Sequence, residues 1–167
     1  MSPDLQQDIG TVPEGVGERL QEDVEALAPF TSRAMIDGLD RFWRMRSWLD
    51  FQALPPERQA KVLPYIRDWI MTARELSGAD VFHGFSQMGA IRDATVAATL
   101  AFDFVLSPTC PVPTFAAEWA SPINDPGRPF EHIAFTLPFN MSEQPAASIH
   151  CGFTARGLPI GLQISGR

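Results

Sequence analysis

Thr109 and Cys110 are the strongest candidates in this sequence for contact with a ligand. They follow the short apolar run Phe104-Val105-Leu106 and lie in a proline-rich segment, Ser-Pro-Thr-Cys-Pro-Val-Pro. Prolines restrict the backbone of such a loop, and α/β proteins place ligand-facing groups where a buried strand ends. We therefore predict that Thr109 and Cys110 line a substrate pocket; a rigid structural loop would account for the same residues equally well.

The histidines and cysteines do not combine into a second site. His150 and Cys151 are adjacent, but neighbours on a strand point to opposite faces, so the imidazole cannot take the thiol proton. His83 and His132 have no carboxylate or second histidine at ligand spacing, which argues against a metal site. Two cysteines without a Cys-x-x-Cys spacing favour reduced thiols. We predict no metal and no cofactor, and nothing singles out a glycosidase-type pair of carboxylates.

The composition is typical of a globular protein, and its negative charge argues against nucleic acid or an anionic membrane as a partner. The 167 residues are 45% hydrophobic and 20% charged, with a formal net charge of −7. Nucleic acids and anionic membranes attract basic patches, so neither is a predicted partner. A membrane span needs about 20 apolar residues, and no run approaches that length. The first ten residues, MSPDLQQDIG, lack the basic and apolar regions of a secretory signal, so we expect a cytoplasmic protein.

Residues 14–100 are predicted to be helical. Apolar residues recur every three or four positions in four successive segments, as on the buried face of an amphipathic helix. These segments run from Pro13 to Pro29, from a Thr31-Ser32 cap to about Phe51, from Pro56 to Ser77-Gly78, and from an Asp80 cap to about Leu100. The aromatic residues on these faces are interpreted as core rather than as a ligand-binding box.

Residues 101–167 are predicted to be rich in strands. The expected strands are 103–107, 146–151 and 158–165, the last two joined as a hairpin by a loop with Gly152 and Gly157 at its ends. A strand and a hairpin do not make a domain alone, so a larger sheet is implied. The predicted fold class is α/β: one incomplete domain over residues 1–167, with a helical front half and strands of a mixed sheet. Its open edges predict self-association.

Five short motifs follow one another in the second half of the sequence. They are Asp103-Phe104-Val105-Leu106-Ser107-Pro108-Thr109, Pro138-Phe139-Asn140, Gln144-Pro145-Ala146, Cys151-Gly152 and Gly157-Leu158-Pro159-Ile160-Gly161-Leu162-Gln163. In order and spacing they resemble the carboxyl-terminal part of the amidase signature family, and the resemblance is strongest over residues 102–167. The family likeness implies an amidase signature fold and adds Asn140 as a third pocket candidate.

Members of that family hydrolyse or transfer carbon–nitrogen amide bonds with a serine nucleophile, a second serine on a cis peptide bond and a lysine base. A serine hydroxyl needs such a base, and a Gly-Ser-rich stretch supplies the oxyanion hole. This sequence has no Ser-Ser pair and no Gly-Gly-Ser run, and its one lysine, Lys61, is expected on a surface helix. No catalytic residue carries over. The resemblance thus implies that this chain is a part of an amide hydrolase and is inactive alone. In the family, the catalytic region precedes the part of the sequence that this chain matches from Met1 onward.

The sequence is also compatible with two other hypotheses: a non-catalytic interaction module that retains the amidase scaffold, and a hydrolase with a different site. A small amide is the expected ligand only if the catalytic region completes the site, and the sequence does not identify which amide. Glu143 departs from the family pattern, because a glycine is usual there. A charge at that position requires an exposed loop and conflicts with a turn of positive φ.

Overall fold

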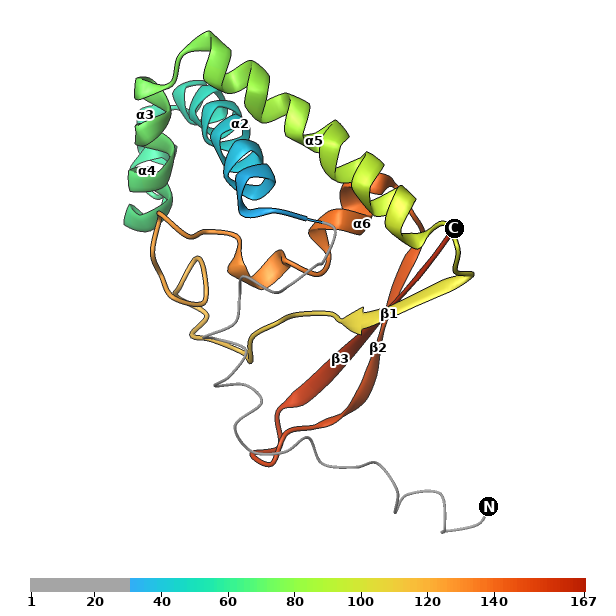
Figure 1. The fold of residues 1–167 in the computed structure, drawn as a ribbon. Helices are drawn as coiled ribbons and strands as arrows, with labels where there is room; N and C mark the ends of the chain where they lie inside the picture. Colours follow the sequence, from blue (N-terminus) through green and yellow to red (C-terminus); the bar gives the residue numbers. More distant parts are fainter. Residues whose placement is uncertain (1–30) are drawn as a thin grey trace, which may run out of the picture.

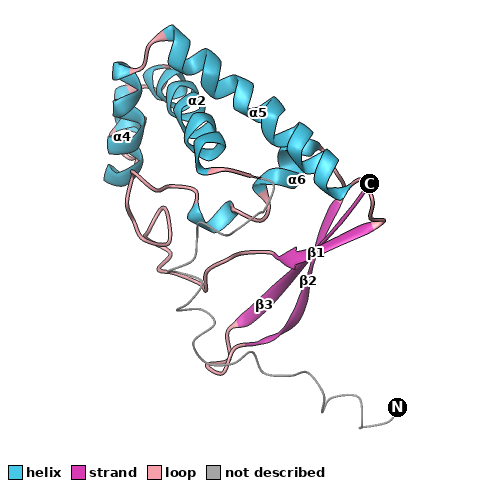
Figure 2. Cartoon of the chain, in the orientation of Figure 1, coloured by secondary structure: helices cyan, strands magenta, loops and turns pink. Residues whose placement is uncertain are grey.

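A computed structural model describes residues 31–167, with the helices gathered at one end and a small sheet at the other (Figures 1 and 2). The expected helix between Pro13 and Pro29 lies outside the described residues. The elements are α2 (Arg33–Gln52), α3 (Pro56–Gln59), α4 (Pro64–Met71), η3 (Thr72–Glu75), α5 (Gly78–Thr99), β1 (Phe104–Pro108), η4 (Glu131–Ile133), α6 (Leu137–Ser142), β2 (Ala146–Phe153) and β3 (Pro159–Gly166). The α/β class, with a helical front half and strands behind it, is confirmed.

Helices α2 and α5 form the centre of the helical part and pack against each other (Figure 1). Their backbones approach closely at two glycines: a Cβ added to Gly84 would lie 2.4 Å from the carbonyl oxygen of Gly38. Leu39 of α2, Ile91 of α5 and Leu137 of α6 make the buried core. Short helix α6 thereby joins the two long helices to the strand region.

We predict that Gly84→Ala destabilises the protein although alanine is the better helix former. The added methyl group meets backbone atoms, which cannot rotate away, and overpacking of this kind costs about 1–3 kcal/mol of unfolding free energy. Gly89 lies on the same helix with no atom within 4 Å of an added Cβ. Gly89→Ala should therefore gain stability, by up to about 1 kcal/mol. Urea unfolding of both variants checks this, and equal midpoints would contradict the close approach.

Hydroxyl side chains cap both long helices. The Ser32 hydroxyl accepts a hydrogen bond from the Met35 amide at 3.3 Å, which confirms the predicted cap of α2. At α5 the cap is Ser77: its hydroxyl accepts from the Asp80 amide, and the Asp80 carboxylate accepts from the Ser77 amide at 2.9 Å. The helix therefore begins at Gly78, and Asp80 is the second partner of a capping box rather than the cap itself.

The single helix expected over residues 56–77 is divided into α3, α4 and η3. Pro64 causes the first break, because proline has no N–H and its ring clashes with the preceding turn; it stands instead at the first position of α4. The Arg67 guanidinium donates to the carbonyls of Gln59, Ala60 and Val62 across the break. Lys61 consequently lies exposed in a turn, not on a helix.

The sheet has the order β1-β3-β2 with antiparallel pairing throughout the described strands. Its strands agree with the predicted ones to within two residues at each end. The hairpin between β2 and β3 closes through a bond from the Gly157 amide to the Thr154 carbonyl at 2.9 Å, and Gly157 has a φ of 78°. A glycine suits that conformation, and it stands at the end of the loop where the hairpin was predicted to turn.

The two faces of the sheet differ in cover. On one face Gln163 and Ser165 are buried, and the Gln163 amide donates to the Phe135 carbonyl in the segment before α6. The opposite face carries Phe104, Leu106 and Ile149, which are 69%, 64% and 47% exposed. No helix in the described part of the chain is both long and apolar enough to cross a membrane.

Candidate functional site

Thr109 is held at the end of β1 by contacts with both of the other strands. Its amide donates to the Gly161 carbonyl at 3.0 Å, which continues the β1–β3 ladder by one residue. Its hydroxyl lies 2.7 Å from the Ser148 hydroxyl on β2. A Cβ on Gly161 would approach the Thr109 Oγ1 to 2.8 Å, so the absence of a side chain at 161 makes room for this contact. The Gly-Leu-Pro-Ile-Gly-Leu-Gln block thus positions the Thr109 hydroxyl.

The other predicted pocket residues lie apart from this hydroxyl pair. Cys110 is exposed with a free thiol, next to the buried Pro111 and Val112. Asn140 is an exposed residue of α6, and its backbone N–H donates to the Thr136 carbonyl. Within residues 31–167 no hydrogen bond links the Asn140 side chain to Thr109 or Cys110. The three pocket assignments therefore remain predictions.

The remaining thiol and histidines form no catalytic pair or metal cluster among the described residues. Cys151 is exposed and free, and the His150 ring contacts Phe153 with a centroid separation of 4.5 Å. The strand is irregular between His150 and Gly152. His132 is half-buried, and its Nδ1 has no partner in the described structure.

Burial lowers the pKa of His132 below the ordinary 6.5, because a charged imidazole loses its hydration there. A lowered histidine pKa means that the unfolded chain binds the proton more readily than the folded one. Stability should therefore be complete above pH 6.5 and fall as the pH drops through that value. We expect the urea midpoint to fall between pH 7.5 and pH 5.5. His132→Gln should reduce this fall, and an unchanged fall in His132→Gln would contradict the assignment.

Glu143 ends α6 in the left-handed conformation, with a φ of 60°. Its side chain is 73% exposed, and its carboxylate lies 3.0 Å from the Arg92 guanidinium. The expectation that a charge here requires an exposed loop is confirmed. The expected conflict with a turn of positive φ does not arise, because Glu143 itself adopts the left-handed backbone at the end of α6. Glycine adopts this backbone without strain, so the family pattern and the backbone geometry agree.

Glycine at 143 should match or exceed the natural residue in stability. Glu143→Gly removes the strain of the left-handed backbone, while the exposed ion pair that it loses contributes at most about 1 kcal/mol. Glu143→Ala loses the pair and keeps the strain. We expect the glycine variant to be about 1 kcal/mol more stable than the alanine variant in urea unfolding. The reverse order would show that the α6 end relaxes out of the left-handed region.

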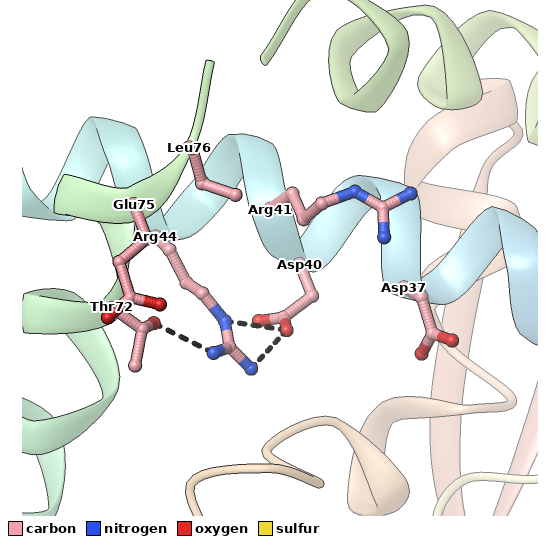
Figure 3. A pocket seen from close by; sticks show the side chains of 7 residues that line it. All are labelled: Asp37, Asp40, Arg41, Arg44, Thr72, Glu75 and Leu76. Carbon is pink, nitrogen blue, oxygen red and sulfur yellow. Dashed lines mark hydrogen bonds and ion pairs between the residues drawn. The ribbon is translucent and has the colours of Figure 1, made fainter. Parts of the chain in front are cut away.

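A charged cleft of about 440 Å³ lies between α2 and η3, and the sequence did not predict it (Figure 3). Its lining residues are Asp37, Asp40, Arg41, Arg44, Thr72, Glu75 and Leu76. The Arg44 guanidinium donates to Asp40 at 2.7 Å, to the Thr72 hydroxyl at 2.8 Å and to the Pro126 carbonyl at 3.2 Å. Figure 3 shows the Arg41 guanidinium directed away from this group.

The buried side of the cleft is an internally satisfied network. Asp40 is 8% exposed and also accepts a hydrogen bond from the Trp69 indole at 2.8 Å. Nearby, burial raises the pKa of Tyr65, whose hydroxyl lies 2.9 Å from the Ser121 hydroxyl. The i,i+4 spacing of Asp40 and Arg44 was visible in the sequence. Because these polar groups already bind one another, they tie α2 to α4, η3 and the 121–129 loop rather than offer a ligand site.

The family model described as Amidase matches residues 30–167. A glutamyl-tRNA(Gln) amidotransferase subunit of Myxococcus xanthus (strain DK1622) is 43% identical over 77 residues, which is 46% of this chain and 15% of that protein. The corresponding subunit of Thermodesulfovibrio yellowstonii (strain ATCC 51303 / DSM 11347 / YP87) is 42% identical over 65 residues, which is 39% of this chain and 13% of the relative.

Solved structures share the fold. A bacterial aryl acylamidase of the amidase signature family superposes with a TM-score of 0.65 at 20% identity, over 95% of this chain and 38% of that one. An amidase crystal structure also gives 0.65, at 22% identity, over 89% of this chain and 36% of that one. The chain thus spans less than two fifths of either solved chain. Because the family model matches all of the described residues and well over half of the whole chain, the chain belongs to the Amidase family.

Proposed function

We propose that this chain is the carboxyl-terminal part of an amidase-family hydrolase of carbon–nitrogen amide bonds, contributing a pocket wall rather than the nucleophile. The observation that carries the proposal is the position of Thr109. The motif that ends in Thr109 sets its hydroxyl at the end of β1. The Gly157–Gln163 motif sets Gly161 next to this hydroxyl, where a larger residue would clash with it. A hydroxyl at the end of a strand can donate to, or accept from, the polar atoms of a small amide.

The hydrogen bonds of the described serines support the proposal that this chain does not supply the nucleophile. A serine nucleophile must give its proton to a base within hydrogen-bond reach. In residues 31–167 no serine hydroxyl is bonded to a lysine or histidine. Ser148 faces Thr109, Ser142 faces the Gln144 amide oxygen, and Lys61 is exposed in its turn. A catalytic serine and its lysine would therefore come from polypeptide outside this chain.

The proposed ligand is a small amide, with no cofactor, nucleic acid or membrane involved. The names of the relatives include an amidotransferase, an aryl acylamidase and a 6-aminohexanoate cyclic dimer hydrolase, so related folds serve different amides. The alternative is an interaction module that keeps the scaffold without chemistry. The exposed apolar face of the sheet favours it, because such a face can bind a partner whether or not catalysis follows.

A completion experiment separates the two. The partner is the M. xanthus amidotransferase polypeptide lacking the segment equivalent to this chain, hereafter the amidase remainder, which is co-expressed with the full 167-residue chain. Ammonia release from glutamine, benzamide and nicotinamide is then measured. We expect hydrolysis by the pair only, and a kcat/KM about 10- to 100-fold lower with Thr109→Val, which removes one hydrogen bond to the substrate. An inactive complex would favour the interaction module.

A further inference from the structure

The open side of the charged cleft between α2 and η3 holds two charged side chains that the buried network does not use. Three of the five charged residues that line the cleft are already in ion pairs: Asp37, Asp40 and Arg44. The other two are Arg41 and Glu75, and within residues 31–167 neither makes a hydrogen bond or an ion pair. Their charges are opposite in sign. A ligand that satisfies both side chains therefore carries one carboxylate and one ammonium group.

Arg41 lies on α2, with its guanidinium directed away from Asp40 and Arg44 (Figure 3). Hydrogen bonds from Ser77, and to a smaller extent the charge of Arg41, lower the pKa of Asp80 near the start of α5. The Asp80 carboxylate is bonded to the Ser77 amide at 2.9 Å and to the Ser77 hydroxyl at 2.6 Å. In the described structure it makes no hydrogen bond to Arg41. Because a guanidinium presents its N–H donors in a planar fork that matches a carboxylate, Arg41 is suited to bind the carboxylate of a ligand.

Leu76 separates the two unpaired charges and gives the cleft an apolar part. It is half-buried, and Figure 3 shows it between Glu75 on one side and Arg41 on the other. A ligand that reaches both charges must cross Leu76, where its methylene groups lose contact with water. The cleft volume of about 440 Å³ lies in the range of small-molecule sites, roughly 300–1,000 Å³. An aliphatic chain with one charge at each end fits this arrangement better than an α-amino acid, whose charged groups are adjacent.

We propose that the cleft between α2 and η3 binds an ω-amino carboxylate, a short aliphatic chain with an ammonium group at one end and a carboxylate at the other. Arg41 binds the carboxylate, Glu75 binds the ammonium group, and the methylene groups lie on Leu76. The site is at the helical end of the molecule, whereas Thr109 follows β1 in the sheet at the other end (Figure 1). The inference is independent of the proposed function, because it uses none of the residues assigned to the amide pocket.

The test uses the full 167-residue chain and 5-aminopentanoate as the probe, and it measures the amide chemical shifts of the protein in low-salt buffer. We expect saturable shifts at the residues that line the cleft. Binding should weaken as salt is added, because ions screen charges at a partly exposed site. Pentanoate and pentylammonium each carry one of the two charges. Each should bind about three- to tenfold more weakly than 5-aminopentanoate, since one charged group of the cleft is then left without a partner.

Variants of the two unpaired side chains test each contact separately. With Arg41→Gln, 5-aminopentanoate should bind no more tightly than pentylammonium, and with Glu75→Gln no more tightly than pentanoate. Arg41→Lys keeps the charge and should bind the probe more tightly than Arg41→Gln. The matched controls are Arg46→Gln and Glu57→Gln, which change an exposed arginine of α2 and an exposed glutamate of α3 outside the cleft and should leave the affinity unchanged. The urea midpoint of each variant checks that it is folded.

Any of four results would overturn the proposal. They are the absence of saturable shifts at millimolar probe, equal binding of the three probes, equal affinities of the cleft variants and their controls, and shifts centred on Thr109 and Ser148 instead of the cleft. The last result would place the amino carboxylate at the amide pocket. The completion experiment measures hydrolysis, so an inactive complex would refute the proposed function and leave this site unaffected.

Discussion

Purified alone, the 167-residue chain should release no product from simple amides at an enzyme-like rate. Amide hydrolases accelerate the reaction by at least about 10⁶-fold, and this acceleration depends on an activated nucleophile and on an oxyanion hole. The chain has ten serines but no Ser-Ser pair, and its one lysine lies exposed between α3 and α4. We therefore expect the rate with the chain present to equal the rate in buffer.

The assay is ammonia release from benzamide and glutamine over several days, with the complex of the chain and the amidase remainder as positive control. Enzyme-like turnover by the chain alone that one Ser→Ala change abolishes would contradict the prediction and identify a nucleophile of another kind. Turnover that survives each of the ten changes and also Cys110→Ser and Cys151→Ser would indicate a contaminating amidase. This separation matters because a trace of host enzyme easily exceeds the uncatalysed rate.

The strands were predictable because their sequence carries its own boundaries. The expected strands 103–107, 146–151 and 158–165 correspond to Phe104–Pro108, Ala146–Phe153 and Pro159–Gly166. Gly157 adopts the positive φ that its place in the hairpin loop requires. Local turn chemistry of this kind depends on a few neighbouring residues, so the sequence is sufficient to predict it.

The helices were predicted less exactly, because periodicity shows an apolar face but not what covers it. Phe82 and Phe85 fit the helical pattern expected for the core, yet they are 68% and 57% exposed. Pro64 divides a segment whose apolar spacing favoured one helix. At Pro64 a local steric effect overrides the periodicity.

The surroundings of the candidate site could not be predicted, because its contacts join distant parts of the chain. Thr109 was identified from its place after a strand, but its hydroxyl partner Ser148 lies 39 residues further along. The same holds for the cleft: Asp40 and Arg44 are an ordinary i,i+4 pair in sequence, whereas Trp69 and the Pro126 carbonyl reach the pair only in the folded protein. Because the folded protein buries this pair, it connects separate elements instead of lying on one helix surface.

Asp40→Ala should destabilise the protein by about 3–5 kcal/mol, the cost of removing one partner from a buried ion pair. The Arg44 guanidinium would keep its bonds to Thr72 and Pro126 but lose its counter-charge at 2.7 Å, with the Arg44 side chain only 17% exposed. The Trp69 indole N–H would also lose its acceptor inside the protein. Asp40→Asn should be intermediate, because an amide oxygen can still accept from Trp69 while the charge is lost.

The matched control is Asp37→Ala, one turn earlier on the same helix. Asp37 pairs with Arg33 at 2.9 Å, but both side chains are 44% exposed, so the loss should stay within about 0.5 kcal/mol. Urea unfolding compares the variants: with an unchanged dependence of the unfolding free energy on urea concentration, the midpoint should fall only for the Asp40 variants. Equal effects at 37 and 40 would mean that water reaches Arg44 and Trp69 in the variant. The network would then be an ordinary surface pair, and the attachment of α2 to α4 and the 121–129 loop would depend on apolar packing alone.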